Sequence, residues 1–376
     1  MNDTTAIFRE PIRQRFGVDI ERAEAKYSSS HRVYVFPEDF VVSLDKSAGS
    51  AENRMGELRF LKDLADAGVT VCAAIPSLAG RLLEPFTAGG EEWTAVKYVK
   101  AKGDAIKGDD VNERHAERVG ETLGRIHALS RDAERAGVVY ARPTWREAGA
   151  SLLDDVRCPA YAPYLEEKAR EKLTDVLARV GALEIEPGVN SGMIHGDFNH
   201  YNYYVSGEEI WVFDFGDCGY GCYLYDVATL LFYWLPRPDA NVGRSAREAG
   251  DALLTAFRRG YERQMTLPEA QWTKLELFMS YRQAVMILDA VHALAFGGKI
   301  AGGEGIARAL PSLLSTFLAD DLFEGIDRKT AQSRATRELV IQALRGEIDL
   351  DAPENVRIKM LLQSDDMKPF IAALLK

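Results

Sequence analysis

The chain has 376 residues, of which 47% are hydrophobic and 27% charged, values that are ordinary for a globular protein with two lobes. Its 46 basic and 57 acidic side chains give a net charge of −11, which argues against nucleic-acid binding because such proteins usually present a basic face. The N-terminus does not resemble a signal peptide, and no apolar run approaches the roughly 18 residues that a membrane span needs. With four scattered cysteines as well, these features predict a cytoplasmic protein with reduced thiols.

The first hundred residues mix helical and strand patterns. Apolar residues recur at helical spacing in two places, and short apolar runs are separated by residues that favour turns. The expected elements are an opening helix within residues 1–24, a β-hairpin at residues 32–36 and 40–44, a helix from about residue 51 to residue 68, and strands at residues 81–86 and 93–99.

The remainder of the chain is expected to be mostly helical. Helical spacing begins after residue 109 and recurs to the C-terminus, with no repeat period. Beyond the segment at residues 119–129, the expected helices lie at residues 145–180 (one or two), 223–234, 244–262, 268–296, 303–320, 329–346 and 353–375. His127 lies on the first of them and is interpreted as a packing histidine rather than a ligand.

Two motifs in the middle of the chain carry most of the chemistry. Each follows a short apolar run suited to a buried strand: HGDFNHYN begins at His195, and DFGD begins at Asp214. The first places Asn202 five residues after Asp197, which is the spacing of a kinase catalytic loop, and the second matches a kinase metal-binding triplet. Phosphoryl transfer needs one carboxylate for the acceptor hydroxyl, and an Asn and a second carboxylate for magnesium.

Gly196, together with the later YDVA at residues 225–228, gives these motifs a closer resemblance. The pattern is similar to the aminoglycoside phosphotransferase and choline kinase superfamily, and nearest to its hydroxylysine kinase and homoserine kinase members. This resemblance implies an α+β, bilobal, protein-kinase-like fold. A small β-rich nucleotide-binding lobe is expected at residues 1–100, and a larger, mostly helical lobe with the catalytic loop at residues 101–376.

The resemblance also implies roles for individual residues. Asp197 orients or deprotonates the acceptor hydroxyl, and Asn202 and Asp214 bind the Mg²⁺ that accompanies ATP. His195 holds the catalytic loop in register with the metal-binding segment. Asp226 braces the loop by accepting backbone hydrogen bonds. The implied reaction moves the ATP γ-phosphate to a hydroxyl of a small molecule.

Residues with implied nucleotide-binding roles come from the first lobe. They are Ser28 and Ser29 in the serine loop that precedes the first hairpin, Ser43 and Glu57, and Val96, Lys97 and Val99 at the strand end where the family holds adenine. The serine loop is equally compatible with a plain polar hairpin entry, because it lacks the glycines that allow close approach to phosphate. Glu57 is equally compatible with a solvated helix position.

Ser43 is the largest departure from the family pattern. The relatives carry a Lys or Arg at this strand position, and a Ser cannot neutralise phosphate charge. Either the chain is a nucleotide-binding pseudokinase scaffold, or another cation reaches the site. The sequence offers Lys46, Lys26 and Arg32 as candidates, and the intact catalytic motif favours an active enzyme. A Ser/Thr protein kinase ranks lower, because no activation segment ending in Ala-Pro-Glu follows Asp214.

The charge distribution around the motifs suggests the nature of the acceptor. Between Arg179 and Arg237 the sequence has eight carboxylates and no Lys or Arg. Carboxylates that converge in one cleft repel one another unless cations bind there. The pattern therefore predicts a cationic, amine-bearing acceptor, with Asp217 and Tyr220 as substrate-side candidates. The identity of the acceptor and the oligomeric state are left open.

Overall fold

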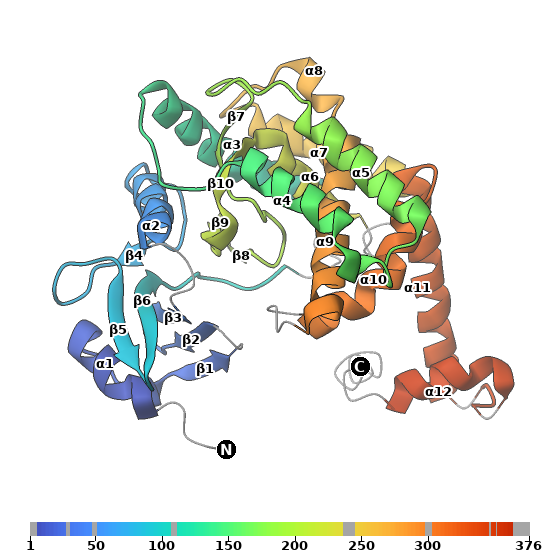
Figure 1. The fold of residues 1–376 in the computed structure, drawn as a ribbon, viewed down its shortest axis with the longest axis horizontal. Coiled ribbons are helices and arrows are strands. Elements are labelled where there is room, and N and C mark those ends of the chain that lie inside the picture. Colours follow the sequence, from blue (N-terminus) through green and yellow to red (C-terminus); the bar gives the residue numbers. More distant parts are fainter. Residues whose placement is uncertain are drawn as a thin grey trace.

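The computed structural model describes residues 6–27, 31–46, 51–106, 111–235, 245–297, 303–345, 347–350 and 352–363. The predicted α+β architecture is confirmed: a small antiparallel sheet lies in the N-terminal part, and the remainder is mostly helical (Figure 1). The expected positions of Ser28 and Ser29 lie outside the described residues.

The main sheet belongs to the N-terminal lobe. Its strands are β1 (Glu24–Tyr27), β2 (His31–Val35), β3 (Phe40–Lys46), β6 (Glu91–Val99) and β4 (Ala74–Ile75) in spatial order, with β5 (Glu84–Ala88) also paired to β6. β1 and β4 are additions to the sequence prediction, and β5 begins later than expected. All these pairs are antiparallel.

The two faces of this sheet serve different purposes. Val42 and Leu44 of β3 join a core with α1 (Ala6–Phe16), which contributes Phe8. Ser43 lies directly opposite Val96 of β6, and Val96 packs with Leu58 of α2 (Ala51–Asp66). Directly opposed residues of antiparallel strands share a face, so Ser43 faces α2 and the second lobe.

Helices form most of the second lobe. They are α3 (Glu113–Arg135), α4 (Trp145–Arg157), α5 (Glu167–Gly181), α6 (Tyr223–Trp234), α7 (Ala246–Tyr261), α8 (Glu269–Trp272), α9 (Leu275–Phe296), α10 (Gly303–Phe317), α11 (Leu322–Leu344) and α12 (Val356–Gln363), with 3₁₀ turns at Pro159–Tyr161, Phe215–Asp217 and Pro353–Asn355; a further 3₁₀ turn, Ile20–Arg22, belongs to the N-terminal lobe. The segment expected as one helix at residues 268–296 is divided into α8 and α9. Residues 364–376 of the expected tail helix lie outside the described residues.

Close packing of α3 against α7 positions the interior of this lobe. A Cβ added at Gly260 would lie 1.8 Å from the carbonyl oxygen of Glu117, so the two helix backbones nearly touch there. This approach brings Tyr261 of α7 beside His127 of α3, with 2.8 Å between the phenol oxygen and Nδ1. His127 is fully buried, as expected for a packing histidine.

Two small two-stranded antiparallel sheets flank the motif residues. β7 (Ser191–Ile194) pairs with β10 (Gly219–Cys222), and β8 (Tyr203–Ser206) pairs with β9 (Glu209–Val212). β8 and β9 lie between the sheet lobe and the helices in Figure 1, and the Cys72 amide donates to the Val212 carbonyl. Among the described helices, none combines the length and apolar character needed to cross a bilayer.

Candidate active site

The catalytic loop links β7 to β8 and is in close contact with the second motif. Gly196 has φ 84°, and a Cβ there would lie 2.2 Å from the carbonyl oxygen of Asp217. Only glycine combines this backbone conformation with such a close approach. The glycine that distinguishes the motif in sequence therefore allows the loop to pack directly on the segment after Asp214.

Asp226 of α6 holds the start of this loop. Its Oδ2 accepts the amide of His195 at 2.8 Å, and its Oδ1 accepts the amide of Gly196 at 2.9 Å. Nε2 of His127 lies 3.1 Å from the same Oδ2. Asp226 is fully buried, and these contacts compensate for the burial of its charge. They are the contacts that the family resemblance implied for this residue.

His195 connects the two motifs. Its Nε2 lies 3.0 Å from the carbonyl oxygen of Phe213, and its Nδ1 accepts the amide of Asp197 at 3.3 Å. This arrangement requires the neutral tautomer with the proton on Nε2. The ring also packs against Phe215, with 4.4 Å between centroids. His195 therefore ties Asp197 to the residues on both sides of Asp214.

The β8–β9 hairpin brings the two candidate metal ligands together. At its open end the Phe213 amide donates to the Asn202 carbonyl at 3.0 Å, and Asp214 follows at once. Nδ2 of Asn202 donates to Oδ2 of Asp197 at 2.9 Å, so the side-chain oxygen of Asn202 is the atom left to face a ligand. Among the described residues, Asp214 is the only non-glycine with positive φ, at 64°.

These two oxygen donors fit a hard divalent cation. Mg²⁺ is commonly held by one or two protein side chains together with substrate phosphates and water, rather than by a full protein cage. The described residues contain no cluster of three or more His, Cys, Asp or Glu that could hold a metal alone. The donor set therefore suits a metal that arrives with a nucleotide.

The second oxygen of Asp197 is occupied by an arginine from a distant helix. Nη2 of Arg282, on α9, lies 2.5 Å from Oδ1 of Asp197 and 3.1 Å from the phenol oxygen of Tyr233. Nη1 lies 3.5 Å from the hydroxyl of Tyr225. The Arg282 side chain is 12% exposed, so the pair is largely removed from water.

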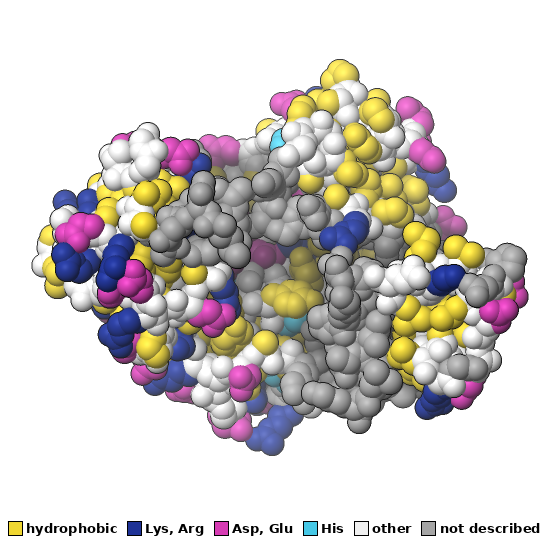
Figure 2. Space-filling model, turned by 90° about the horizontal axis from the view of Figure 1, so that it is seen from below, with side chains coloured by type: hydrophobic (Ala, Val, Ile, Leu, Met, Phe, Trp, Pro, Cys, Tyr) yellow, Lys and Arg dark blue, Asp and Glu magenta, His cyan; other side chains and the backbone are white. Residues whose placement is uncertain are grey.

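Further carboxylates lie around this pair. The surrounding protein limits hydration of the Asp217 carboxylate and raises its pKa; the nearby charge of Asp197 raises it further, whereas Arg282 lowers it. Burial also raises the pKa of Asp289 on α9, against the opposing effect of Arg282. Figure 2 shows a hollow between the strand-rich lobe and the helices, with acidic and histidine side chains at its depth. Asp197, Asp217 and Asp289 interact electrostatically around Arg282, and this group is called the acidic recess below.

Glu57 of α2 has a basic partner, which comes from its own helix rather than from β3. Nη1 of Arg54 lies 2.8 Å from Oε2 of Glu57, and Nη2 lies 2.9 Å from the Tyr98 hydroxyl and 3.3 Å from Oδ2 of Asp45. Glu57 is buried, and this burial raises its pKa while Arg54 lowers it. The solvated-helix alternative for Glu57 is therefore wrong.

The three basic residues that the sequence suggested as replacements for a strand lysine do not contact Glu57. Lys46 pairs with Glu91 at 2.8 Å. The Arg32 guanidinium lies over the rings of Phe8 and Trp93, on the α1 side of the sheet. Lys26 is exposed on β1.

The candidate adenine-binding residues occupy the centre of the sheet. Val96 is buried in the face toward α2. The Lys97 ammonium lies 4.1 Å from the ring centroid of Phe40, and the Val99 amide donates to the carbonyl of Ala73 at 3.0 Å. Because the Val99 amide already has a hydrogen-bond partner, we expect the backbone groups that bind the base to follow Val99 in the chain.

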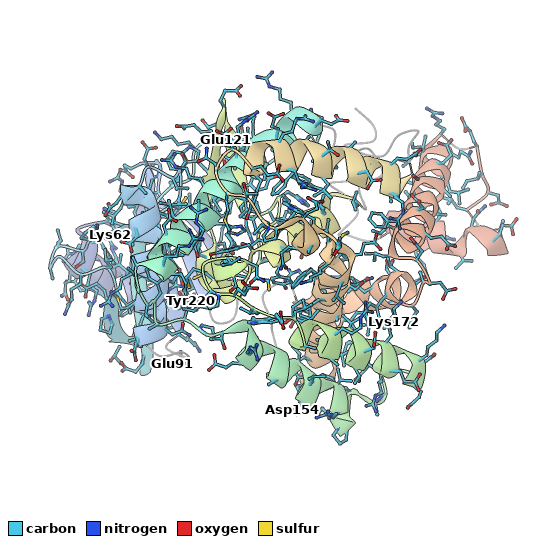
Figure 3. All side chains as sticks on the ribbon, turned by 90° about the horizontal axis from the view of Figure 1, so that it is seen from above. Lys62, Glu91, Glu121, Asp154, Lys172 and Tyr220 are labelled. Atoms are coloured by element: carbon cyan, nitrogen blue, oxygen red, sulfur yellow. The ribbon has the colours of Figure 1, made fainter. Side chains whose placement is uncertain are left out.

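Tyr220 is engaged away from the recess. Its hydroxyl accepts the backbone amide of Tyr140 at 2.8 Å, and its ring lines a separate pocket of about 250 Å³ with Trp145 and Ile185. In Figure 3 Tyr220 lies near the middle of the molecule, whereas Lys62 lies at its outer surface. The Tyr220 hydroxyl therefore already has a backbone partner, and its substrate-side role stays a prediction.

Three arginines near the motifs were absent from the sequence interpretation. Besides Arg54 and Arg282, Arg142 donates through Nε to the Cys218 carbonyl at 2.6 Å and through Nη2 to the Gly216 carbonyl at 2.5 Å. Arg54 could have been found, because it lies three residues before Glu57 on one helix. Arg142 and Arg282 carry no local signal, since only the tertiary fold brings them to the motifs.

Comparisons with known proteins agree with this geometry. Residues 20–278 match the model of the phosphotransferase enzyme family. The chain is 26% identical over 246 residues to amicoumacin kinase of Bacillus subtilis strain 168, covering 65% of this chain and 71% of the relative. It is 31% identical over 193 residues to homoserine kinase of Pseudomonas aeruginosa strain LESB58, covering 49% and 55%.

Solved structures show the same fold. The structure of amicoumacin kinase hAmiN in complex with AMP-PNP, Ca²⁺ and Ami aligns with a TM-score of 0.70 at 19% identity, covering 86% of this chain and 97% of that one. The microcompartment-associated aminopropanol kinase aligns with a TM-score of 0.53 at 18% identity, covering 88% and 98%.

Proposed function

The chain belongs to the phosphotransferase enzyme family and is a small-molecule kinase, and we propose that it moves the γ-phosphate of ATP to a hydroxyl of an amine-bearing acceptor. The observation that carries this proposal is the arrangement of Asp197, Asn202 and Asp214 around one loop end, held by His195 and Asp226. We also propose a cytoplasmic location, where ATP is available.

The chain's own residues account for most of the proposed mechanism. Asp197 accepts a hydrogen bond from the acceptor hydroxyl and orients its oxygen toward the γ-phosphate. Asn202 and Asp214 would hold Mg²⁺, which neutralises phosphate charge when bound. Because the transfer is in-line, positioning and charge neutralisation supply most of the acceleration.

The amine on the acceptor is inferred from the charge of the recess. Asp217 and Asp289 add carboxylates beyond those needed for catalysis and metal binding, and Arg282 offsets only part of their charge. A protonated amine would relieve this excess. The aminopropanol kinase among the similar structures is consistent with such an acceptor.

A Ser/Thr protein kinase is less well supported. In this structure β10 and α6 follow Asp214 almost directly, which leaves little chain for an activation segment that could hold a peptide. The space beside Asp197 is instead bounded by side chains of α9, which suits a compact acceptor.

The proposal can be tested by measuring ADP formation with a panel of amino alcohols, hydroxy amino acids, aminoglycosides and neutral sugars. The N-acetylated form of each accepted amine serves as its matched control, and the Asp197→Asn variant controls for background hydrolysis. We expect turnover of at least one amine and a much poorer reaction with its acetylated form. A neutral sugar or an acidic metabolite as the best acceptor would contradict the amine assignment.

A further inference from the structure

We propose that Arg54 of α2 supplies the positive charge for the α- and β-phosphates that β3 lacks at Ser43. This inference rests on the proposed kinase function and identifies a phosphate-binding residue for it. It also accounts for how an intact catalytic loop can operate in a chain that lacks the strand lysine.

The position of Arg54 matches that of the missing side chain. Ser43 and Asp45 lie two residues apart on β3, so both side chains point toward the same face of the sheet. Arg54 reaches this face from α2 and bonds to Asp45 at 3.3 Å and to Glu57 at 2.8 Å. Its guanidinium thus connects the strand to Glu57, as a lysine at position 43 would do in the family pattern.

Two polar atoms at this point lack hydrogen-bond partners. The Ser43 hydroxyl and Nε of Arg54 are both buried, and neither makes a hydrogen bond within the described part of the chain. Buried donors without partners are rare in native proteins and call for an explanation. Phosphate oxygens, which accept hydrogen bonds from guanidinium and hydroxyl groups, would satisfy both.

One of the two ion pairs of Arg54 could also be replaced by an anionic ligand. Arg54 contacts two carboxylates, but unequally: Glu57 is buried with a side-chain exposure of 3%, whereas Asp45 is 31% exposed and makes the longer contact. The contact with Asp45 is the one that a phosphate can replace, because Asp45 can turn toward water. The contacts with Glu57 and Tyr98 then keep the guanidinium in place.

The other basic groups near this lobe are less suitable. Lys46 is paired with Glu91 at 2.8 Å, and Arg32 lies over rings on the opposite face. Arg142 bonds to backbone carbonyls beside Asp214. Arg142 also lowers the pKa of Glu57 by its charge, but among the described residues the hydrogen bond to Glu57 comes from Arg54.

The test is calorimetric binding of ATP, ADP and adenosine, each to full-length protein with Mg²⁺. Charged hydrogen bonds contribute about 1.5–3 kcal/mol, so Arg54→Ala should weaken ATP and ADP binding about tenfold to a hundredfold. Adenosine binding should change little, because adenosine has no phosphate. Arg59→Ala is the matched control, since Arg59 is exposed on the same helix and its loss should change none of the three affinities.

A second pair of variants separates charge from structure. Arg54→Gln retains hydrogen-bonding capacity toward Glu57 and should lose ATP affinity as Arg54→Ala does. The double variant Ser43→Lys/Arg54→Ala returns a cation to the strand and should recover most of the ATP affinity. Thermal unfolding of each variant verifies that it folds.

The outcomes distinguish this inference from the proposed function. If the wild type shows no preference for ATP over adenosine, the proposed function itself fails. If the wild type prefers ATP and both Arg54 variants keep that preference, only the role of Arg54 is wrong. Equal loss of ATP and adenosine binding, without recovery in the double variant, would show a purely structural role and overturn the inference.

Discussion

Arg282 and Asp197 form an ion pair across 85 positions of sequence, with 2.5 Å between Nη2 and Oδ1. The pair links the catalytic loop to α9, which also carries Asp289. Because Asn202 occupies the other oxygen of Asp197, both oxygens of this carboxylate have partners before an acceptor arrives. Arg282 thereby fixes the direction of Asp197, and we expect its positive charge to lie near the phosphate during transfer.

Replacing Arg282 should therefore impair turnover more than nucleotide binding. We expect Arg282→Met to lower kcat about 10²-fold, the order of magnitude for loss of one preorganised charged donor. The affinity for ATP should stay within about threefold, because the contacts of Arg282 lie on the acceptor side. Steady-state kinetics with an accepted substrate, together with ATP calorimetry, would measure both effects.

Arg282→Lys is the informative control. A lysine keeps the charge but cannot bond to Asp197, Tyr225 and Tyr233 from one planar group, so an intermediate kcat is expected. If Arg282→Met were as active as wild type, the ion pair would be dispensable for turnover; if it were more active, the pair would be an inhibitory contact that an acceptor must displace.

Asp197→Asn tests the catalytic carboxylate itself. The amide cannot accept a proton, so turnover should fall about 10²-fold or more. ATP affinity should be nearly unchanged, because Asp197 contacts Asn202 and Arg282 rather than the nucleotide face of the sheet. Comparing kcat with the calorimetric Kd for ATP checks this expectation. A folded variant with normal turnover would exclude the assigned role.

The sequence could indicate which residues gather around the loop because the information there is local. The spacing from His195 to Asn202 and the two strand-like runs place Asp197, Asn202 and Asp214 beside two small antiparallel sheets. The same local information revealed the excess of carboxylates between Arg179 and Arg237, from which a cationic acceptor was predicted. Arg282, which lies outside this interval, neutralises part of that negative charge by pairing with Asp197.

Two other interpretations relied on proximity along the chain. The search for the missing cation considered residues near Ser43 along the chain, whereas α2 brings Arg54 to the same face. Tyr220 was grouped with Asp217 by proximity in sequence, but pairing of β10 with β7 turns its hydroxyl toward the amide of Tyr140. Sequence proximity does not determine which face of a strand a side chain occupies.

Asp214→Ala tests the metal assignment. A carboxylate on the metal is lost, so the Mg²⁺-dependent part of ATP affinity should disappear while the metal-independent part persists. Calorimetry with a non-hydrolysable ATP analogue, with and without Mg²⁺, measures this difference directly. Asp217→Ala is a suitable control from the same turn, and it should retain the metal effect. An equal response to Mg²⁺ in Asp214→Ala and wild type would refute the assignment.

The last prediction concerns stability at low pH and His115 of α3. Burial, together with the charges of Arg118 and His200, lowers the pKa of His115 from 6.5 to about 3. The imidazole lies 2.9 Å from the hydroxyl of Tyr203, the first residue of β8. Between pH 6.5 and about 3 the unfolded chain therefore binds a proton that the folded chain does not, so this residue makes stability fall as pH falls.

Near pH 4.5 the contribution should be about 2–3 kcal/mol, from about 1.4 kcal/mol for each pH unit below 6.5. His115→Gln can still bond to Tyr203 but cannot take up the proton. We expect this variant to be less stable than wild type at pH 7.5, because it loses ring packing, but to lose less stability on acidification. Urea unfolding at several pH values gives the pH dependence of the unfolding free energy for wild type and for His115→Gln. His292→Gln serves as a control on an exposed histidine. Parallel pH profiles for wild type and His115→Gln would show that His115 does not remain neutral in the folded protein.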